Sequence, residues 1–194
     1  EVNMNKIFEK KCETEYFDVA NGDSCTKLGE NILKYMDKTM PENATPVILC
    51  IGTDRATGDC LGPLVGDKLM DYSSNFKVLG CLSSPVHALN LKQVIQGIYD
   101  NYSNPFIIAV DASLGDHSMV GAVTVSNCPI YPGNGVNKKL PAIGDVSITG
   151  IVNISGQSSH LLQSTRLHIV MQLADYIAQA LKYTIDYFED FCPL

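Results

Sequence analysis

The sequence predicts an α/β fold, a three-layer α-β-α sandwich around a mostly parallel, twisted sheet of about five strands. Three short apolar runs, 46–51, 76–79 and 106–110, alternate with two segments whose apolar residues recur at helical spacing. Right-handed crossover units with short connections produce this alternation, and each helix then packs back onto the sheet. The size also fits, because 194 residues with 45% hydrophobic content suit one core.

The chain begins with a polar, weakly patterned segment, residues 1–22, which we expect to pack loosely. The three residues before Met4 could be a vector remnant. Residues 23–194 are expected to form a single α/β domain. Its first helix would be capped by Asp23 or Ser24 and would end before Pro41.

The remaining elements follow from the same criteria of apolar spacing and turn residues. We expect helices at about 62–72 and 91–98, strands at 120–125 and 146–152, and a long terminal helix from about Ser159. Residues 127–145 contain too much glycine and proline for a strand ladder and are expected to form a loop.

Composition excludes two classes of partner. A net charge of -7 with only 14 Lys and Arg argues against nucleic acid, since such binding needs a basic face. No apolar stretch is long enough to cross a bilayer, so no membrane partner is expected. The seven cysteines lack a C-x-x-C pair and resemble small core residues of a reducing compartment, and the start of the chain is charged throughout. We therefore expect a cytoplasmic protein.

Two aspartates carry the predicted chemistry. Asp59 follows the first strand in a glycine-rich loop, and Asp111 comes immediately after the third. The carboxyl ends of parallel strands share one edge of a sheet, where open α/β folds bind ligands. A nearby helix start would favour ionised Asp59, while a second carboxylate opposes double ionisation, so the two could share a proton and act as acid and base. Alternatively, each aspartate merely caps a helix or a turn.

Other catalytic motifs are absent or weaker. The sequence contains no G-x-G-x-x-G, no phosphate-binding P-loop and no G-x-S-x-G elbow. Cys60 follows Asp59 at a helix start, but no histidine is evident for it and a packing role is favoured. His87 and His117 each follow a predicted strand and could reach the two acids, whereas His160 and His168 belong to the final helix.

Three motifs carry a resemblance to a known family. Residues 52–63, 109–112 and 130–138 resemble, in order and spacing, the germination (spore) endoprotease family. The compact size and residues 145–153 resemble the YyaC-type spore protease family more closely. Both families are related to the hydrogenase-maturation endopeptidases, and the resemblance implies their α-β-α sandwich.

The resemblance also implies roles for individual residues. It places Asp59 and Asp111 on the acidic pair of the germination protease, and the Tyr131–Lys138 loop, which contains Asn134, at the border of the cleft. His87 and Asn134 are then candidates for an auxiliary or substrate-binding role. In the hydrogenase-maturation enzymes two such acids and a later histidine hold a metal ion, for which this chain offers His117. A divalent metal ion on Asp59, Asp111 and His117 thus stays open, and no other cofactor is expected.

The resulting expectation is a sporulation-associated endopeptidase that hydrolyses a protein or peptide substrate in the cytoplasm of a sporulating cell or in the spore interior. The alternative is a non-catalytic sporulation factor that uses the same fold to bind a protein or a metal ion. Assembly into a homo-oligomer stays open.

Overall fold

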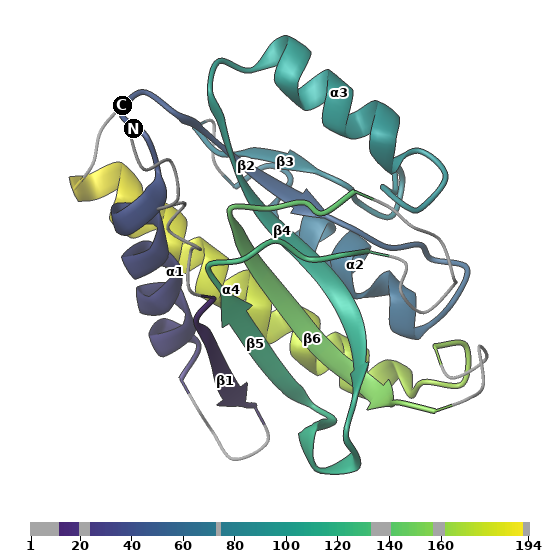
Figure 1. Cartoon of the computed structure of the whole chain (residues 1–194). Coiled ribbons are helices and arrows are strands. Elements are labelled where there is room, and N and C mark those ends of the chain that lie inside the picture. The colour runs from purple at the N-terminus through teal and green to yellow at the C-terminus, as the bar shows by residue number, and fades with distance from the viewer. Residues whose placement is uncertain (1–11, 20–23, 73–74, 133–140, 157–161, 192–194) are drawn as a thin grey trace, which may run out of the picture.

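The computed structural model describes residues 12–19, 24–72, 75–132, 141–156 and 162–191. Within them lies a six-stranded sheet in the order β1-β5-β6-β4-β2-β3 (Figure 1). The parallel strands are β2 (Thr45–Cys50), β3 (Lys77–Leu79), β4 (Pro105–Gly115) and β6 (Val146–Ile154), and the antiparallel ones are β1 (Thr14–Asp18) and β5 (Ala122–Ser126). The predicted mostly parallel sheet is confirmed, with one strand more than expected.

Helices cover both faces of the sheet, as the sequence predicts. On one face pack α1 (Cys25–Thr39), α2 (Leu61–Leu69) and α4 (Leu167–Phe191), and on the other lies α3 (Leu91–Asn101). Alternate residues of β2 serve the two layers, since Ile48 faces the three helices and Val47 faces α3. Within the described part of the chain, no helix is both long and apolar enough to cross a membrane.

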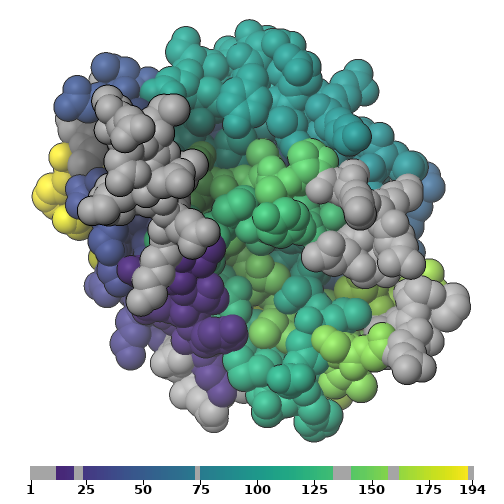
Figure 2. All heavy atoms as spheres, viewed as in Figure 1, coloured from purple at the N-terminus to yellow at the C-terminus, as the bar shows by residue number. Residues whose placement is uncertain are grey.

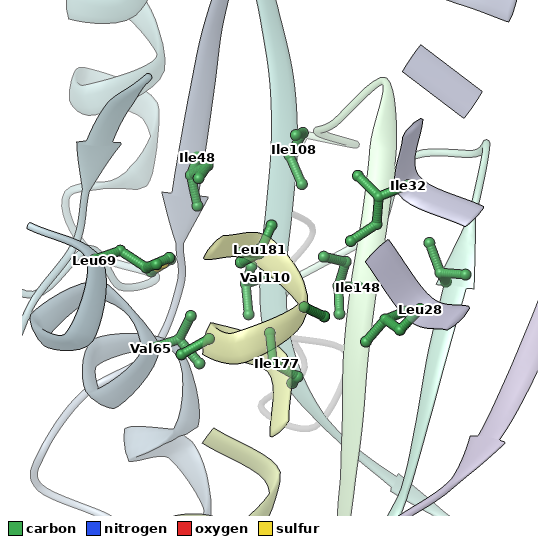
Figure 3. Packing of buried hydrophobic residues seen from close by; sticks show 14 of the residues in the cluster. Leu28, Ile32, Ile48, Val65, Leu69, Ile108, Val110, Ile148, Ile177 and Leu181 are labelled. Carbon is green, nitrogen blue, oxygen red and sulfur yellow. The ribbon is translucent and has the colours of Figure 1, made fainter. Parts of the chain in front are cut away.

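The larger core lies between the sheet and the three helices on its first face. Four strand residues, Ile48, Ile108, Val110 and Ile148, meet α4 at the centre of this layer, with α1 and α2 on either side (Figure 3). The helix residues that pack there are Leu28 and Ile32 of α1, Val65 and Leu69 of α2, and Ile177 and Leu181 of α4. Each such buried side chain stabilises the fold by roughly 1.5–3 kcal/mol.

The amino-terminal segment differs from the sequence-based expectation. We expected loose packing up to residue 22, but β1 pairs antiparallel with β5 along its whole length. Phe17 is 5% exposed in the core, and Glu15 forms an ion pair with Lys34 of α1 at 3.1 Å. A five-residue edge strand with one inward-facing large apolar side chain is too short to give a clear periodic signal, which explains the miss.

The cysteines also differ from expectation in part. Cys12 and Cys128 form a disulfide, with their Cα atoms 5.6 Å apart, although we expected unpaired core cysteines throughout. The two residues meet because Cys12 precedes β1 and Cys128 follows β5 at the same end of the antiparallel pair. Cys50, Cys60 and Cys81 are free and buried, as expected. Cys25 is free and half-buried, and Cys192 lies outside the described residues.

The terminal helix begins at Leu167 instead of near Ser159. Residues 162–164 form a turn in front of it, and Thr165, between this turn and the helix, is buried. The carbonyl oxygen of Leu162 accepts a hydrogen bond at 2.7 Å from the N–H of Gly58, in the loop that follows β2. The Leu162 carbonyl thus takes part in a tertiary hydrogen bond, and the helical spacing of apolar residues in the sequence does not reveal such a bond.

The packing of β1 can be tested with two adjacent aromatic residues. Phe17→Ala should lower the free energy of unfolding by roughly 2–4 kcal/mol, because it removes a buried ring. Tyr16→Ala is the control, since Tyr16 is 60% exposed, and it should change stability by less than about 0.5 kcal/mol. Urea denaturation measures both values, and equal effects would show that β1 does not pack as described.

Candidate active site at the end of strand β2

Asp111 lies inside β4 and not beyond its end, which corrects the sequence-based placement. The neighbouring strand β2 stops at Cys50, opposite Val110, so Asp111 is the first residue of β4 without a β2 partner. On its other side it pairs with Thr149 of β6. By strand alternation its carboxyl group is on the same face as Ala109, the face that carries α3.

That face is only partly covered by a helix. The residues of α3 pack over β2 and β4, with Leu91 and Ile98 buried among Val47, Leu49 and Ile107. Figure 2 shows atoms from the green part of the chain, which includes β5 and β6, at the surface beside it. The β4 residues that pack in the α3 layer, Ile107 and Ala109, both precede Asp111.

Asp59 is brought to this place by the loop between β2 and α2. It lies in the short 3-10 helix η1 (Gly58–Cys60), which is anchored by the Gly58–Leu162 hydrogen bond. Gly52 has a φ of 144°, and a Cβ there would overlap the carbonyl oxygen of Asp59. The N–H of Thr53 donates to that same oxygen at 3.1 Å. Only glycine at 52 allows η1 to close onto the end of β2.

The two carboxyl groups are electrostatically linked. Burial and the charge of Asp59 together raise the pKa of Asp111 to about 8, against a 2.8 Å hydrogen bond from the Ala112 N–H to Oδ1 that lowers it. Burial also raises the pKa of Asp59, against the backbone N–H of Thr53 and the charge of His87. Asp59 therefore ionises first, and between the two titration steps the pair holds one proton.

His87 is close enough to Asp59 for its charge to lower the Asp59 pKa. The preceding residue, Val86, extends the β3 side of the sheet, because its carbonyl accepts the Gly52 N–H at 2.7 Å. The Leu89 N–H donates to Nδ1 of His87 at 3.3 Å, so a neutral imidazole carries its proton on Nε2.

Asn90 holds the His87 loop, a role that the sequence did not reveal. Its Oδ1 accepts the His87 N–H at 2.8 Å, and its Nδ2 donates to the carbonyl of Pro85 at 3.0 Å. A single Asn before a helix looks like an ordinary cap, although here its side chain bonds back across the turn. The sequence feature that could have indicated this role is the position of Asn90 three residues after His87.

His117 does not join the two acids, so the metal trio that the sequence left open is not assembled among the described residues. It is exposed in the 3-10 helix η2 (His117–Met119), beyond the end of β4. From Asp111 to Gly115 the strand alone advances about 13 Å, at roughly 3.3 Å per residue. Among the described residues, no three His, Cys, Asp or Glu side chains form a group that could hold a metal ion. The described donor set is thus two carboxylates, and we assign no step to a metal.

Two further candidates can be placed. Asn134 and most of the Tyr131–Lys138 loop lie outside the described residues. The Cys60 thiol donates to the carbonyl of Thr57 at 2.8 Å. Burial raises the Cys60 pKa, and the charge of Asp59 adds to the rise. A thiol that is held neutral in this way is a poor nucleophile, which supports a packing role.

Comparison with known proteins gives relatives at two levels of similarity. YyaC of Bacillus subtilis (strain 168), described as an uncharacterized protein, is 51% identical over 140 residues, or 71% of this chain and 68% of YyaC. The germination protease of Bacillus licheniformis is 29% identical over 116 residues, which are 52% of this chain but only 32% of that protein.

Among solved structures, the NiFe hydrogenase maturation protease HycI from Thermococcus kodakarensis KOD1 aligns with a TM-score of 0.45 and 15% identity. The alignment covers 78% of this chain and 99% of HycI. A family model described as "Protein of unknown function (DUF1256)" matches residues 18–180, a range that includes Asp59, His87 and Asp111. The chain belongs to this family.

Proposed function

We propose that this chain is an endopeptidase in which Asp59 and Asp111 share one proton. The main support for this proposal is that the pKa values of both acids are raised. The pKa of Asp111 is about 8 and depends on the charge of Asp59. Two neighbouring carboxyl groups whose pKa values are pushed apart provide a base and an acid at the same pH. Hydrolysis of a peptide bond needs both.

In the proposed reaction ionised Asp59 takes a proton from a water molecule as the water oxygen attacks the scissile carbonyl carbon, while neutral Asp111 donates its proton to the carbonyl oxygen. The carbon–nitrogen bond then breaks as Asp59 gives its proton to the leaving nitrogen and a hydroxyl of the tetrahedral intermediate returns a proton to Asp111. Because Oδ1 of Asp111 accepts the Ala112 N–H, the donated proton is on Oδ2. The Nε2–H of His87 is the group that would orient Asp59.

Similarity to the germination protease supports a protein as substrate. Its Bacillus source, shared with YyaC, supports a role in the cytoplasm of a sporulating cell or in the spore interior. The competing possibility is a binding module in which Asp111 only caps the Ala112 N–H, a bond that the structure contains. The two functions differ in whether the acids are needed for cleavage.

The first test incubates wild-type protein, Asp59→Asn and Asp111→Asn with a lysate of sporulating cells, with and without chelator. New amino termini are then labelled and identified by mass spectrometry. Each substitution should reduce their formation by about 10²-fold or more, because it removes the acid or the base. The exposed neighbours Asp54 and Asp116 supply the controls, Asp54→Asn and Asp116→Asn, which should cleave like wild type.

The outcome separates the possible roles. Equal patterns of termini from wild type and both acid variants, all folded, would leave the binding module as the function. Loss of cleavage with chelator alone would assign a metal to the reaction. If Asp111→Asn is less stable but cleaves like wild type at an equal concentration of folded protein, the Asp111 carboxyl group only caps the Ala112 N–H.

The pH profile of cleavage gives a second prediction. Activity should fall as the pH rises past about 8, because Asp111 then loses the proton that it must donate. It should also fall on the acid side, at a pH above the ordinary Asp value of 3.8, as Asp59 becomes protonated. Values of kcat/KM against pH for a peptide that spans an identified cleavage site would measure both limbs. A flat profile from pH 5 to 9 would contradict the shared proton.

The free energy of unfolding should decrease as pH rises, whereas a carboxylate in an ordinary buried ion pair makes it increase. Between pH 3.8 and about 8, folded Asp111 holds a proton that the unfolded chain has lost, so the free energy of unfolding decreases as pH rises. Asp59 acts in the same direction. The stability of Asp111→Asn relative to wild type should therefore increase from pH 4 to pH 8 in urea denaturation. Asp116→Asn should show no such trend.

A further inference from the structure

Strand β4 continues past the strand beside it. β2 ends at Cys50, opposite Val110, whereas β4 runs on to Gly115 (Figure 1). On its other side β4 stays paired with β6 up to Gly115, opposite Ile154. From Asp111 onward, therefore, the β2 side of β4 has no neighbouring strand among the described elements, and the helical elements that follow β2, η1 and α2, contact β4.

Strand alternation identifies the backbone groups on this edge. The Val110 carbonyl accepts a hydrogen bond from the residue that follows β2, so Val110 faces the β2 side. Ala112 and Leu114, two and four residues later, face the same side. The Gly115 carbonyl accepts from Ser155, just beyond β6, which agrees with odd-numbered residues facing β6.

Most of these edge groups have no backbone partner among the described residues. The Ala112 N–H donates to Oδ1 of Asp111, but its carbonyl has no backbone donor in that part of the chain. Neither the N–H nor the carbonyl of Leu114 has one there. Both residues are half-buried. A row of unpaired N–H and carbonyl groups is the surface to which an extended peptide adds as a strand.

The edge begins at the acid pair. Ala112 follows Asp111 directly, and the charge of Asp59 reaches Asp111, so a peptide on this edge would pass both carboxyl groups. The side chains of Ala112 and Leu114 pack into the core on the α4 face, which leaves the backbone as the recognition element. Recognition through backbone groups requires an extended segment and favours no particular sequence.

We propose that the substrate binds as an extended segment that pairs with the β4 edge at Ala112 and Leu114, in line with β2. The proposal rests on the proposed function, because the pairing presents a peptide bond to Asp59 and Asp111. It names the substrate class as flexible or unfolded stretches of protein, and compact domains are excluded until such a stretch is exposed.

The test uses binding, so that it does not depend on cleavage. A random dodecapeptide library is selected on Asp59→Asn protein, and the best binder is synthesised with each backbone amide N-methylated in turn. Strand pairing predicts that methylation at alternate residues weakens binding by about tenfold or more, while the intervening positions change it by less than about twofold. This series leaves the protein unaltered.

Matched protein variants give the second arm. Leu114→Pro removes the edge N–H and should weaken binding of the parent peptide by about tenfold or more. Asp116→Asn lies beyond the end of β4, leaves the edge unaltered and should bind like the starting protein. Circular dichroism checks the fold of both, and the N-methyl series decides if Leu114→Pro does not fold.

Three results would overturn the proposed pairing: no selected binder, a binder without the alternating pattern, or a Leu114 amide already protected from hydrogen exchange in the free protein. The last result would mean that the edge is occupied by the chain itself. Alternating binding by a protein that cleaves nothing would keep the pairing and reject the endopeptidase. Cleavage without the alternating pattern of binding would keep the endopeptidase and reject the pairing.

Discussion

The site depends on the close approach of backbones at the carboxyl end of β2. A side chain on Gly52 would overlap the Asp59 carbonyl, and one on Gly62, at the start of α2, would overlap the backbone of Ile51. Because both positions lack a Cβ, η1 and α2 close directly onto the end of the strand. This closure brings Asp59 to Asp111, and without it the two acids would be separate loop and strand residues with ordinary chemistry.

The same packing makes the two acids unequal. Burial raises the pKa of Asp59, but Asp59 is in a loop where the Thr53 N–H and His87 both favour its ionised form. Asp111 lies in the sheet, where burial and the charge of Asp59 favour its neutral form, and only the Ala112 N–H opposes them. The different protonation states thus follow from where each acid sits, one in the loop and one in the strand. A pair with matched surroundings would have no preferred acid and no preferred base.

The sequence predicts the layers and the acid pair because both depend on local patterns. An apolar run of strand length followed by glycine or aspartate is visible without tertiary information, and it predicts Asp59 and Asp111 at one edge of the sheet, where the charge of Asp59 acts on Asp111. It does not show that β4 continues through residues 111–115, since this stretch mixes polar and apolar residues and its strand form depends on pairing with β6. The same limit hides β1 and the role of Asn90, which depend on contacts between distant or folded-back segments.

The continuation of β4 has two opposite effects on the chemistry. It carries His117 away from the acids and so removes the third ligand that the resemblance suggested. It also creates an unpaired backbone edge that starts at Asp111. The two effects are linked through one hydrogen bond, because Oδ1 of Asp111 accepts the first edge N–H, that of Ala112. The proposed proton donor is thus held by the strand that would hold the peptide, so a substrate aligned on β4 would also be aligned with Asp111.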